Sequence, residues 1–395
     1  MAESGVPRVP PVPRVPFVFD DAQRQLRDMV RKFCADNFGA TAAHRPLESG
    51  ELYDAGTWHR LGSELGVLAM AVPESDGGAG GCLVDQAVAV EEFGAALAVG
   101  PLFGTVYLAI PALVACRPGP ARDGLLSVLA DGRRTAAFAV ADFAGAFDPD
   151  RVTVTVEGGR LTGTARQVVD ATGAEVILFA ANGSDGTGLY AVESADLERT
   201  PLVTMDPTRP QSTVTLRGAP ARLLAGPEDA GRVINHALRV GAVLLAVEQV
   251  GAAQHLLDLS VEYAMSRLQF GRQIGSFQAV KHRLADMFVD LEHARSTAYH
   301  AVWALTDGSD DPALAASIAQ ATCSAAFSRI AADTIQVHGG IGFTWEHQAH
   351  QYFKRAATDA ALLGTAEQHR SRVAELVLDT AIAHSGAISV ATGRP

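Results

Sequence analysis

Two blocks of the sequence carry residue types that could bind an anion. The first, Arg267 to His282, reads RLQFGRQIGSFQAVKH, and the second, Gln336 to Thr344, reads QVHGGIGFT. Both blocks are expected at helix ends, where unpaired backbone N–H groups and the helix dipole favour negative charge. An arginine beside a glycine turn, with a glycine pair that lets backbone approach a ligand closely, suits the pyrophosphate of a dinucleotide.

Apolar residues at helical spacing organise the first part of the chain. Asp20 is a good N-cap for a helix whose apolar positions begin at Leu26, and the pattern returns around Trp58. The uncharged stretch 97–116 is long enough to span a bilayer, but its glycines and prolines favour two short buried helices. We predict a helical N-terminal domain over residues 19–133 and no membrane span.

The hydrophobic period changes from 3.6 to 2 in the middle of the chain. Val152, Val154 and Val156 alternate with threonines, and Glu157 to Arg160 supplies a hairpin turn. Further strands are expected near 175–179 and 212–216. Residues 134–225 therefore predict a β domain, either a small barrel or a sandwich.

Long Ala/Leu/Val-rich helices dominate the rest of the chain. The pattern predicts helices from Pro227 to about Arg267, from Ser276 to about Leu305, from Pro312 to His338 and from Gln348 to about Ala383. Residues 226–395 should form a four-helix bundle, which makes the chain an α+β protein. Because these helices are apolar on more than one face, an oligomer is expected.

The composition of the chain limits which binding partners and which cellular compartment are expected for the protein. The chain has 395 residues, a net charge of -12 and 48% hydrophobic residues, which argues for a globular protein and against nucleic acid as its partner. Four cysteines show neither paired spacing nor metal-ligand spacing, so we expect a cytoplasmic protein without disulfide or metal. Residues 1–18 are proline-rich and predict a flexible arm, with a docking role as the alternative.

Together the two blocks, in this order, resemble the acyl-CoA dehydrogenase family of FAD flavoproteins, over about Phe19 to Ala383. The resemblance implies that Arg267 and Gln269 contact the flavin pyrophosphate of a neighbouring subunit. It places Phe270 near the adenine and Gln278 on the adenosine half. The same dinucleotide would be cradled from its other side by Gln336, Gly339 and Gly340. The alternatives are structural: an arginine that binds last-turn carbonyls, and a core phenylalanine.

The flavin-ring end of the resemblance is weaker. Family members usually present a T-E-P-x-A-G-S-D-like turn and a W-I-T-N-like strand beside the ring. The matching stretches here are Ala141 to Asp148 and Gln167 to Asp170, without the hydroxyls and the tryptophan. We therefore expect contacts to the dinucleotide half and poor contacts to the isoalloxazine.

The catalytic carboxylate of the family is missing from its usual positions. Most members carry a Glu just before a Gly-Thr, and the position here is Leu363 or Gly364. Other members place the base on the long helix, which here is Gly241. Glu248, on the same face, is a candidate base of raised pKa, although it could instead pair with an arginine of a neighbouring chain or lie on a subunit interface. Glu367 is better explained as an exposed helix start.

Loss of a general base typically costs about 10²–10⁴ in rate, so another chain should supply it. The sequence resembles the base-lacking subunits of bacterial heterotetrameric members. The expected activity is α,β-dehydrogenation of an acyl thioester carried by coenzyme A or a carrier protein. Electrons would pass to an electron-transfer flavoprotein. The alternatives are a flavin-dependent hydroxylase or oxidase on the same fold and a non-catalytic structural subunit.

Overall fold

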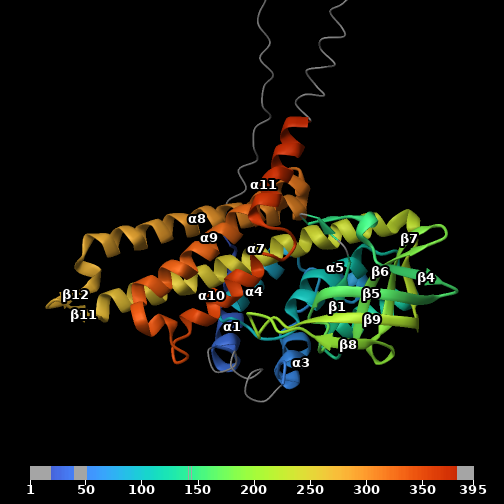
Figure 1. Ribbon diagram of the computed structural model, residues 1–395, viewed down its shortest axis with the longest axis horizontal. Helices are drawn as coiled ribbons and strands as arrows, with labels where there is room; N and C mark the ends of the chain where they lie inside the picture. The colour runs from blue at the N-terminus through green and yellow to red at the C-terminus, as the bar shows by residue number, and fades with distance from the viewer. Residues whose placement is uncertain (1–18, 40–50, 141, 144, 380–395) are drawn as a thin grey trace, which may run out of the picture.

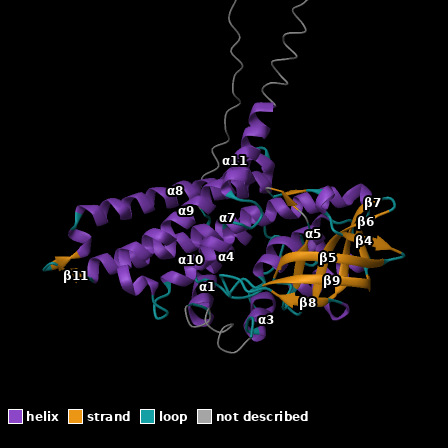
Figure 2. Ribbon diagram, in the orientation of Figure 1, coloured by secondary structure: helices purple, strands orange, loops and turns teal. Residues whose placement is uncertain are grey.

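The computed structural model describes residues 19–39, 51–140, 142–143 and 145–379. A helical N-terminal part, a β-sheet part and a helical C-terminal part follow one another along the chain (Figures 1 and 2). The predicted α+β architecture is confirmed. The predicted arm over residues 1–18 lies outside the described residues.

Short helices form the N-terminal part. Asp20 caps the first of them through a capping box and accepts the Gln23 N–H at 2.8 Å. The uncharged stretch is buried and helical, but its π-helix continues directly into a short α-helix without the predicted break into two helices. The elements are α1 (Asp21–Asn37), α3 (Ala55–Ser63), η1 (Glu74–Asp76), α4 (Leu83–Ala95), η2 (Leu102–Ala109), α5 (Ile110–Ala115) and α6 (Pro120–Ala130).

The middle part is one eight-stranded mixed sheet in the order β10-β7-β6-β4-β5-β9-β8, with β1 paired to β6. The predicted hairpin joins β4 to β5, and the turn between these strands lies at Gly158 and Gly159, which both have positive φ. Leu161, Phe179 and Val214 belong to a separate core enclosed by this sheet. The strands are β1 (Ala136–Ala139), β4 (Val154–Glu157), β5 (Arg160–Val169), β6 (Val176–Gly183), β7 (Gly186–Glu193), β8 (Glu198–Pro201), β9 (Gln211–Pro220) and β10 (Arg222–Ala225). A separate hairpin pairs β2 (Asp142–Phe143) with β3 (Ala146–Phe147), and 3-10 turns lie at η3 (Pro149–Arg151) and η4 (Ser194–Asp196).

Three long helices of the C-terminal part agree with the predicted ones to within a few residues. They are α7 (Pro227–Ser266), α8 (Gln278–Asp307) and α9 (Pro312–His338). Between α7 and α8 lie a hairpin of β11 (Leu268–Gln269) and β12 (Arg272–Gln273), then η5 (Ile274–Ser276). The 3-10 turn η6 (Gly339–Phe343) follows α9.

The fourth predicted helix is interrupted. It divides into α10 (Ala349–Asp359), α11 (Ala366–Ala374) and the π-turn η7 (Glu375–Asp379). Leu363 and Gly364 break it, with φ of 55° and 99°, and Thr365 then caps α11 through a capping box. The predicted end of this helix at Ala383 lies outside the described residues.

The helix α7 is the central packing element of the molecule. It contacts the N-terminal helices, the sheet and the other bundle helices (Figure 1). By length and composition it could cross a bilayer, but 89% of its most apolar window is buried in the protein. A helix that is apolar on every side and enclosed in this way is a core helix.

Candidate functional site

The antiparallel order of α7, α8 and α9 brings the two sequence blocks to one end of the bundle (Figure 1). Arg267 is the C-cap of α7, and its N–H donates to the Tyr263 carbonyl at 2.8 Å. The Tyr263 ring stacks on His338, the last residue of α9, with centroids 4.4 Å apart. This stack joins the end that carries Arg267 to the end that carries Gly339.

The first block is exposed. The Arg267 guanidinium has no hydrogen bond or ion pair with any described residue, so it does not bind the last-turn carbonyls. Gln269 is exposed on the β11–β12 hairpin. Phe270 is 89% exposed at φ 54° and meets Phe277 edge to face, so it is not a core residue of this chain. Gln278 begins α8 and its Nε2 lies 2.7 Å from His282 Nε2.

The second block offers open backbone. Gly339 has a φ of 63°, and a Cβ placed on Gly339 or Gly340 would meet no atom within 4 Å. Gln336 is exposed one turn before them. An unpaired arginine beside open glycine backbone at the same bundle end fits the phosphate half of a dinucleotide. We call Arg267, Gln269, Gln278, Gln336, Gly339 and Gly340 the phosphate corner.

The turn that matches the flavin-ring region lies at the opposite end of α7. The Phe147 N–H donates to Asn235 Oδ1 at 2.9 Å, which fixes the β2–β3 hairpin against the third turn of α7. A Cβ placed on Gly145 would lie 3.3 Å from both the His369 ring and the Leu363 carbonyl. Thus the hairpin, α7 and the α10–α11 junction converge.

Gly241 and Leu363, the two positions that the resemblance assigned to a base, lie close together in the structure. A Cβ on Gly241 would lie 3.3 Å from Leu363 Cδ1 and 2.6 Å from Leu108 Cδ2. Leu363 and Leu108 are buried, and the Leu363 carbonyl lies 2.8 Å from His369 Nε2. Two leucine side chains therefore lie at the positions that the resemblance assigned to a base.

Glu248 is held by two arginines of its own chain, so the predicted pairing with a neighbouring chain is wrong. Its Oε1 accepts from Arg209 and, at 2.6 Å, from Arg355. Burial opposes ionisation, but the two guanidiniums outweigh it and lower the pKa of Glu248 to about 2. A carboxylate this acidic and this enclosed is a poor general base, and the raised pKa predicted for it is also wrong.

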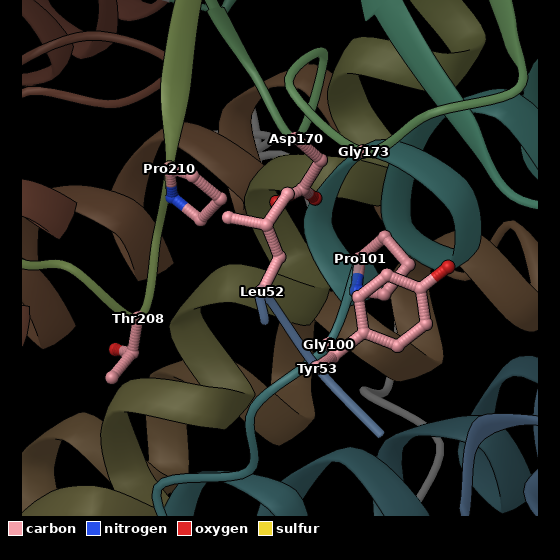
Figure 3. A pocket seen from close by; sticks show the side chains of 8 residues that line it. All are labelled: Leu52, Tyr53, Gly100, Pro101, Asp170, Gly173, Thr208 and Pro210. Carbon is pink, nitrogen blue, oxygen red and sulfur yellow. The ribbon is translucent and has the colours of Figure 1, made fainter. Parts of the chain in front are cut away.

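Two buried carboxyls that the sequence did not single out lie around this ion pair. Asp359 is fully buried, and burial raises its pKa to about 7 despite Arg209. Burial also raises the pKa of Asp170 to about 6, although Asp170 accepts the Gly104 N–H at 2.8 Å. Figure 3 shows Asp170 in a slot of about 10 Å³, enough for roughly one water. The slot is also lined by Leu52, Tyr53, Gly100, Pro101, Gly173, Thr208 and Pro210.

Asp359→Asn is expected to raise the free energy of unfolding at pH 8 by about 1–3 kcal/mol and to change it little at pH 4. The folded pKa of Asp359 lies above its unfolded value of about 4, so the wild type loses stability as the pH rises from about 4 to about 7. The asparagine cannot ionise and escapes that loss. Urea unfolding at both pH values measures the difference, with exposed Asp28→Asn as control. An equal effect at the two pH values would contradict the assignment.

Comparison with protein-family models matches two of them to this chain. The model described as acyl-CoA dehydrogenase, N-terminal domain, matches residues 20–116. The model described as acyl-CoA dehydrogenase, C-terminal domain, matches residues 229–378. The phosphate corner lies within the second match.

Whole-chain relatives give the same result. Acyl-CoA dehydrogenase IpdE2 of Mycobacterium tuberculosis is 36% identical over 87% of this chain and 93% of its own. Among solved structures, the ChsE4-ChsE5 complex from Mycobacterium tuberculosis superposes with a TM-score of 0.81, at 27% identity, over 91% of this chain and 98% of that one. A variant of the Tcur3481-Tcur3483 steroid ACAD has a TM-score of 0.80, at 29% identity, over 91% and 99%.

Proposed function

Because the chain belongs to the acyl-CoA dehydrogenase family, whose members are FAD flavoproteins, we propose that it is one half of a two-chain dehydrogenase. In this proposal the chain holds the phosphate half of FAD, and a related subunit supplies the ring pocket and the catalytic carboxylate. The reaction is α,β-dehydrogenation of an acyl thioester. The names of two solved relatives, each a pair of chains, support a paired assembly.

The length of α7 carries this proposal. The helix has 40 residues and spans roughly 60 Å. The phosphate corner begins at Arg267, whereas the hairpin that matches the ring region is fixed at Asn235, roughly 48 Å away along the helix. That distance exceeds the length of an extended flavin dinucleotide. A cofactor held at the phosphate corner therefore needs a ring pocket from another chain.

The residues of the phosphate corner would bind and orient the cofactor. Arg267 offers a planar set of N–H donors to the pyrophosphate, and the open backbone at Gly339 and Gly340 allows close approach. Bound FAD would accept the hydride that leaves the β-carbon of the thioester. The exposed rings of Phe270 and Phe343, which belong to the two blocks at this end of the bundle, would exclude water once a partner covers them.

Removal of the α-proton would fall to the partner. Leu363 and Gly241 carry no proton acceptor, and Glu248 is committed to Arg209 and Arg355. The thioester carrier, coenzyme A or a protein, and an electron-transfer flavoprotein as acceptor complete the proposal. The steroid named in one relative at 29% identity makes a steroid-derived thioester a substrate to compare with straight-chain ones.

Turnover with an artificial electron acceptor tests whether the catalytic carboxylate comes from a partner chain. The chain alone is expected to oxidise acyl-CoA at least about 10²-fold more slowly than the chain co-expressed with a base-bearing related subunit. Substituting the carboxylate of that subunit by glutamine should abolish the rate, and oxygen uptake in the same assay would reveal a hydroxylase. Equal rates with and without the subunit would contradict the proposal.

A non-catalytic structural subunit is the second candidate, because Leu108 and Leu363 pack against Gly241 in the expected base region. It is favoured if the assembled complex keeps its flavin and its rate when the phosphate corner is mutated.

A further inference from the structure

A second cavity lies apart from the phosphate corner and from the contact at Gly241. It has a volume of about 270 Å³, room for on the order of ten non-hydrogen atoms. The π-helix η2 separates it from the expected base position, because Leu108 faces Gly241 while Val106 lines the cavity. Its walls come from the segment after α3, the start of α4, η2 with α5, the first half of α7 and the end of α8. The lining residues are Ala69, Ala71, Val72, Cys82, Leu83, Gln86, Val106, Ile110, Pro111, Val114, His236, Val240, Leu244, Leu305 and Thr306.

The cavity has an apolar floor and a polar mouth. Val240 and Leu244 on α7 are buried, as are Val106 and Ile110 opposite them, whereas His236 and Thr306 are exposed. Most of the lining residues are aliphatic, and none of them is Asp or Glu. Gln86, its buried polar residue, is fully engaged with the backbone at Val67 and Met70. The floor therefore suits a hydrocarbon and offers it no polar partner.

Along one face of α7, the side chains change from charged to apolar toward the inside of the cavity. Residues at i, i+4 spacing read Arg232, His236, Val240 and Leu244. The Arg232 Nη2 donates to the Ala115 carbonyl at 3.1 Å, directly after cavity-lining Val114, so the guanidinium lies beside the rim although Arg232 does not itself line the cavity.

Two arginines act on His236 at the mouth of the cavity. Desolvation, and then the charges of Arg239 and Arg232, lower the pKa of His236, so its imidazole is uncharged at neutral pH and can bind an anion only as a neutral hydrogen-bond donor. Asp229, the acid within reach of Arg232 at 3.4 Å, is shared with Arg117. A guanidinium and an imidazole at the rim of an apolar cavity suit a ligand that has one anionic group and a hydrocarbon tail.

We propose that this cavity is a second ligand site, which binds a medium-chain carboxylate with its tail against Val240 and Leu244 and its carboxylate at Arg232 and His236. The site goes beyond the proposed dehydrogenase function, because it shares no residue with the phosphate corner and needs no partner chain. The volume and the polar mouth set the ligand class: a chain of about eight carbons that ends in a carboxylate fills the space.

Calorimetric titration of the full chain with octanoate, 1-octanol and acetate tests this site. Octanoate is expected to bind one per chain, at least about tenfold more tightly than octanol, and acetate should not bind measurably. Arg232→Gln should weaken octanoate by about tenfold and leave octanol unchanged. Arg217→Gln, an exposed arginine on β9, is the matched control and should change neither.

A substitution that fills the cavity distinguishes binding in the cavity from non-specific binding elsewhere on the surface. Val114→Trp, at a half-buried rim position, should abolish binding of both octanoate and octanol, and Ala71→Phe serves if that variant does not fold. Absence of saturable octanoate binding, or binding that survives the filled cavity, overturns the site. Equal affinity for octanol and octanoate overturns the carboxylate assignment.

Discussion

Glu248→Ala is expected to lower the free energy of unfolding by about 3–5 kcal/mol. The substitution leaves Arg209 and Arg355, whose side chains are 4% and 3% exposed, buried without the carboxylate that they share. Asp206 still accepts from Arg355 at 2.6 Å, but among the described acids Arg209 is left with Asp359 at 3.7 Å. Because a domain is typically stable by about 5–15 kcal/mol, the loss should be visible as partial unfolding at moderate temperature.

Urea unfolding followed by circular dichroism measures this loss. Glu248→Gln removes the charge at constant shape and should fall between wild type and alanine. Glu198→Ala breaks the exposed pair with Arg217, at 3.2 Å, and should cost less than about 1 kcal/mol. Glu248, Arg209, Arg355, Asp206 and Asp359 form a buried network of ion pairs. A cost for Glu248→Ala as small as that of the exposed pair would show that this network does not hold the sheet, α7 and α10 together.

Arg267→Ala is expected to lower the affinity of the assembled complex for FAD by about 10- to 100-fold, because a charged hydrogen bond contributes about 1.5–3 kcal/mol. The stability of the chain should not change, since Arg267 is exposed and has no bond to a described residue. Flavin retained after dialysis, measured from its absorption, gives the result directly.

Arg272→Ala is the matched control for this loss. Arg272 lies in the same hairpin and is also exposed, but its guanidinium covers the Phe277 ring at 4.2 Å. It should change flavin content far less than Arg267→Ala. If both variants retain flavin as the wild type does, Arg267 does not contact the cofactor.

Hydrophobic periodicity was sufficient for most of the helices and for the β part. The helices α7, α8 and α9 carry long uninterrupted apolar patterns bounded by Pro227, Pro312 and glycine turns, so local sequence determines them. The break in the fourth helix had a weaker signal. Leu363 takes a left-handed conformation that its side chain disfavours, and the bond from its carbonyl to His369 is a tertiary contact.

The phosphate corner and the buried network differ in how far apart their residues lie in the sequence. The corner consists of two short motifs at helix ends, so their spacing alone pointed to an anion site. Glu248 pairs with Arg209 and Arg355, which lie 39 and 107 residues away. No local sequence pattern identifies such distant partners, so pairing with an arginine of another chain was among the alternatives for Glu248. An acid one turn after Arg355, in an otherwise apolar helix end, was the available signal for Asp359.

The flavin bound by the purified chain, alone and then mixed with a base-bearing related subunit, tests the central claim most directly. If one chain holds the phosphates and another the ring, the chain alone should be colourless after gel filtration. The mixed complex should then carry one FAD per pair of chains. A stable yellow protein from this chain alone, active on acyl-CoA, would contradict the account.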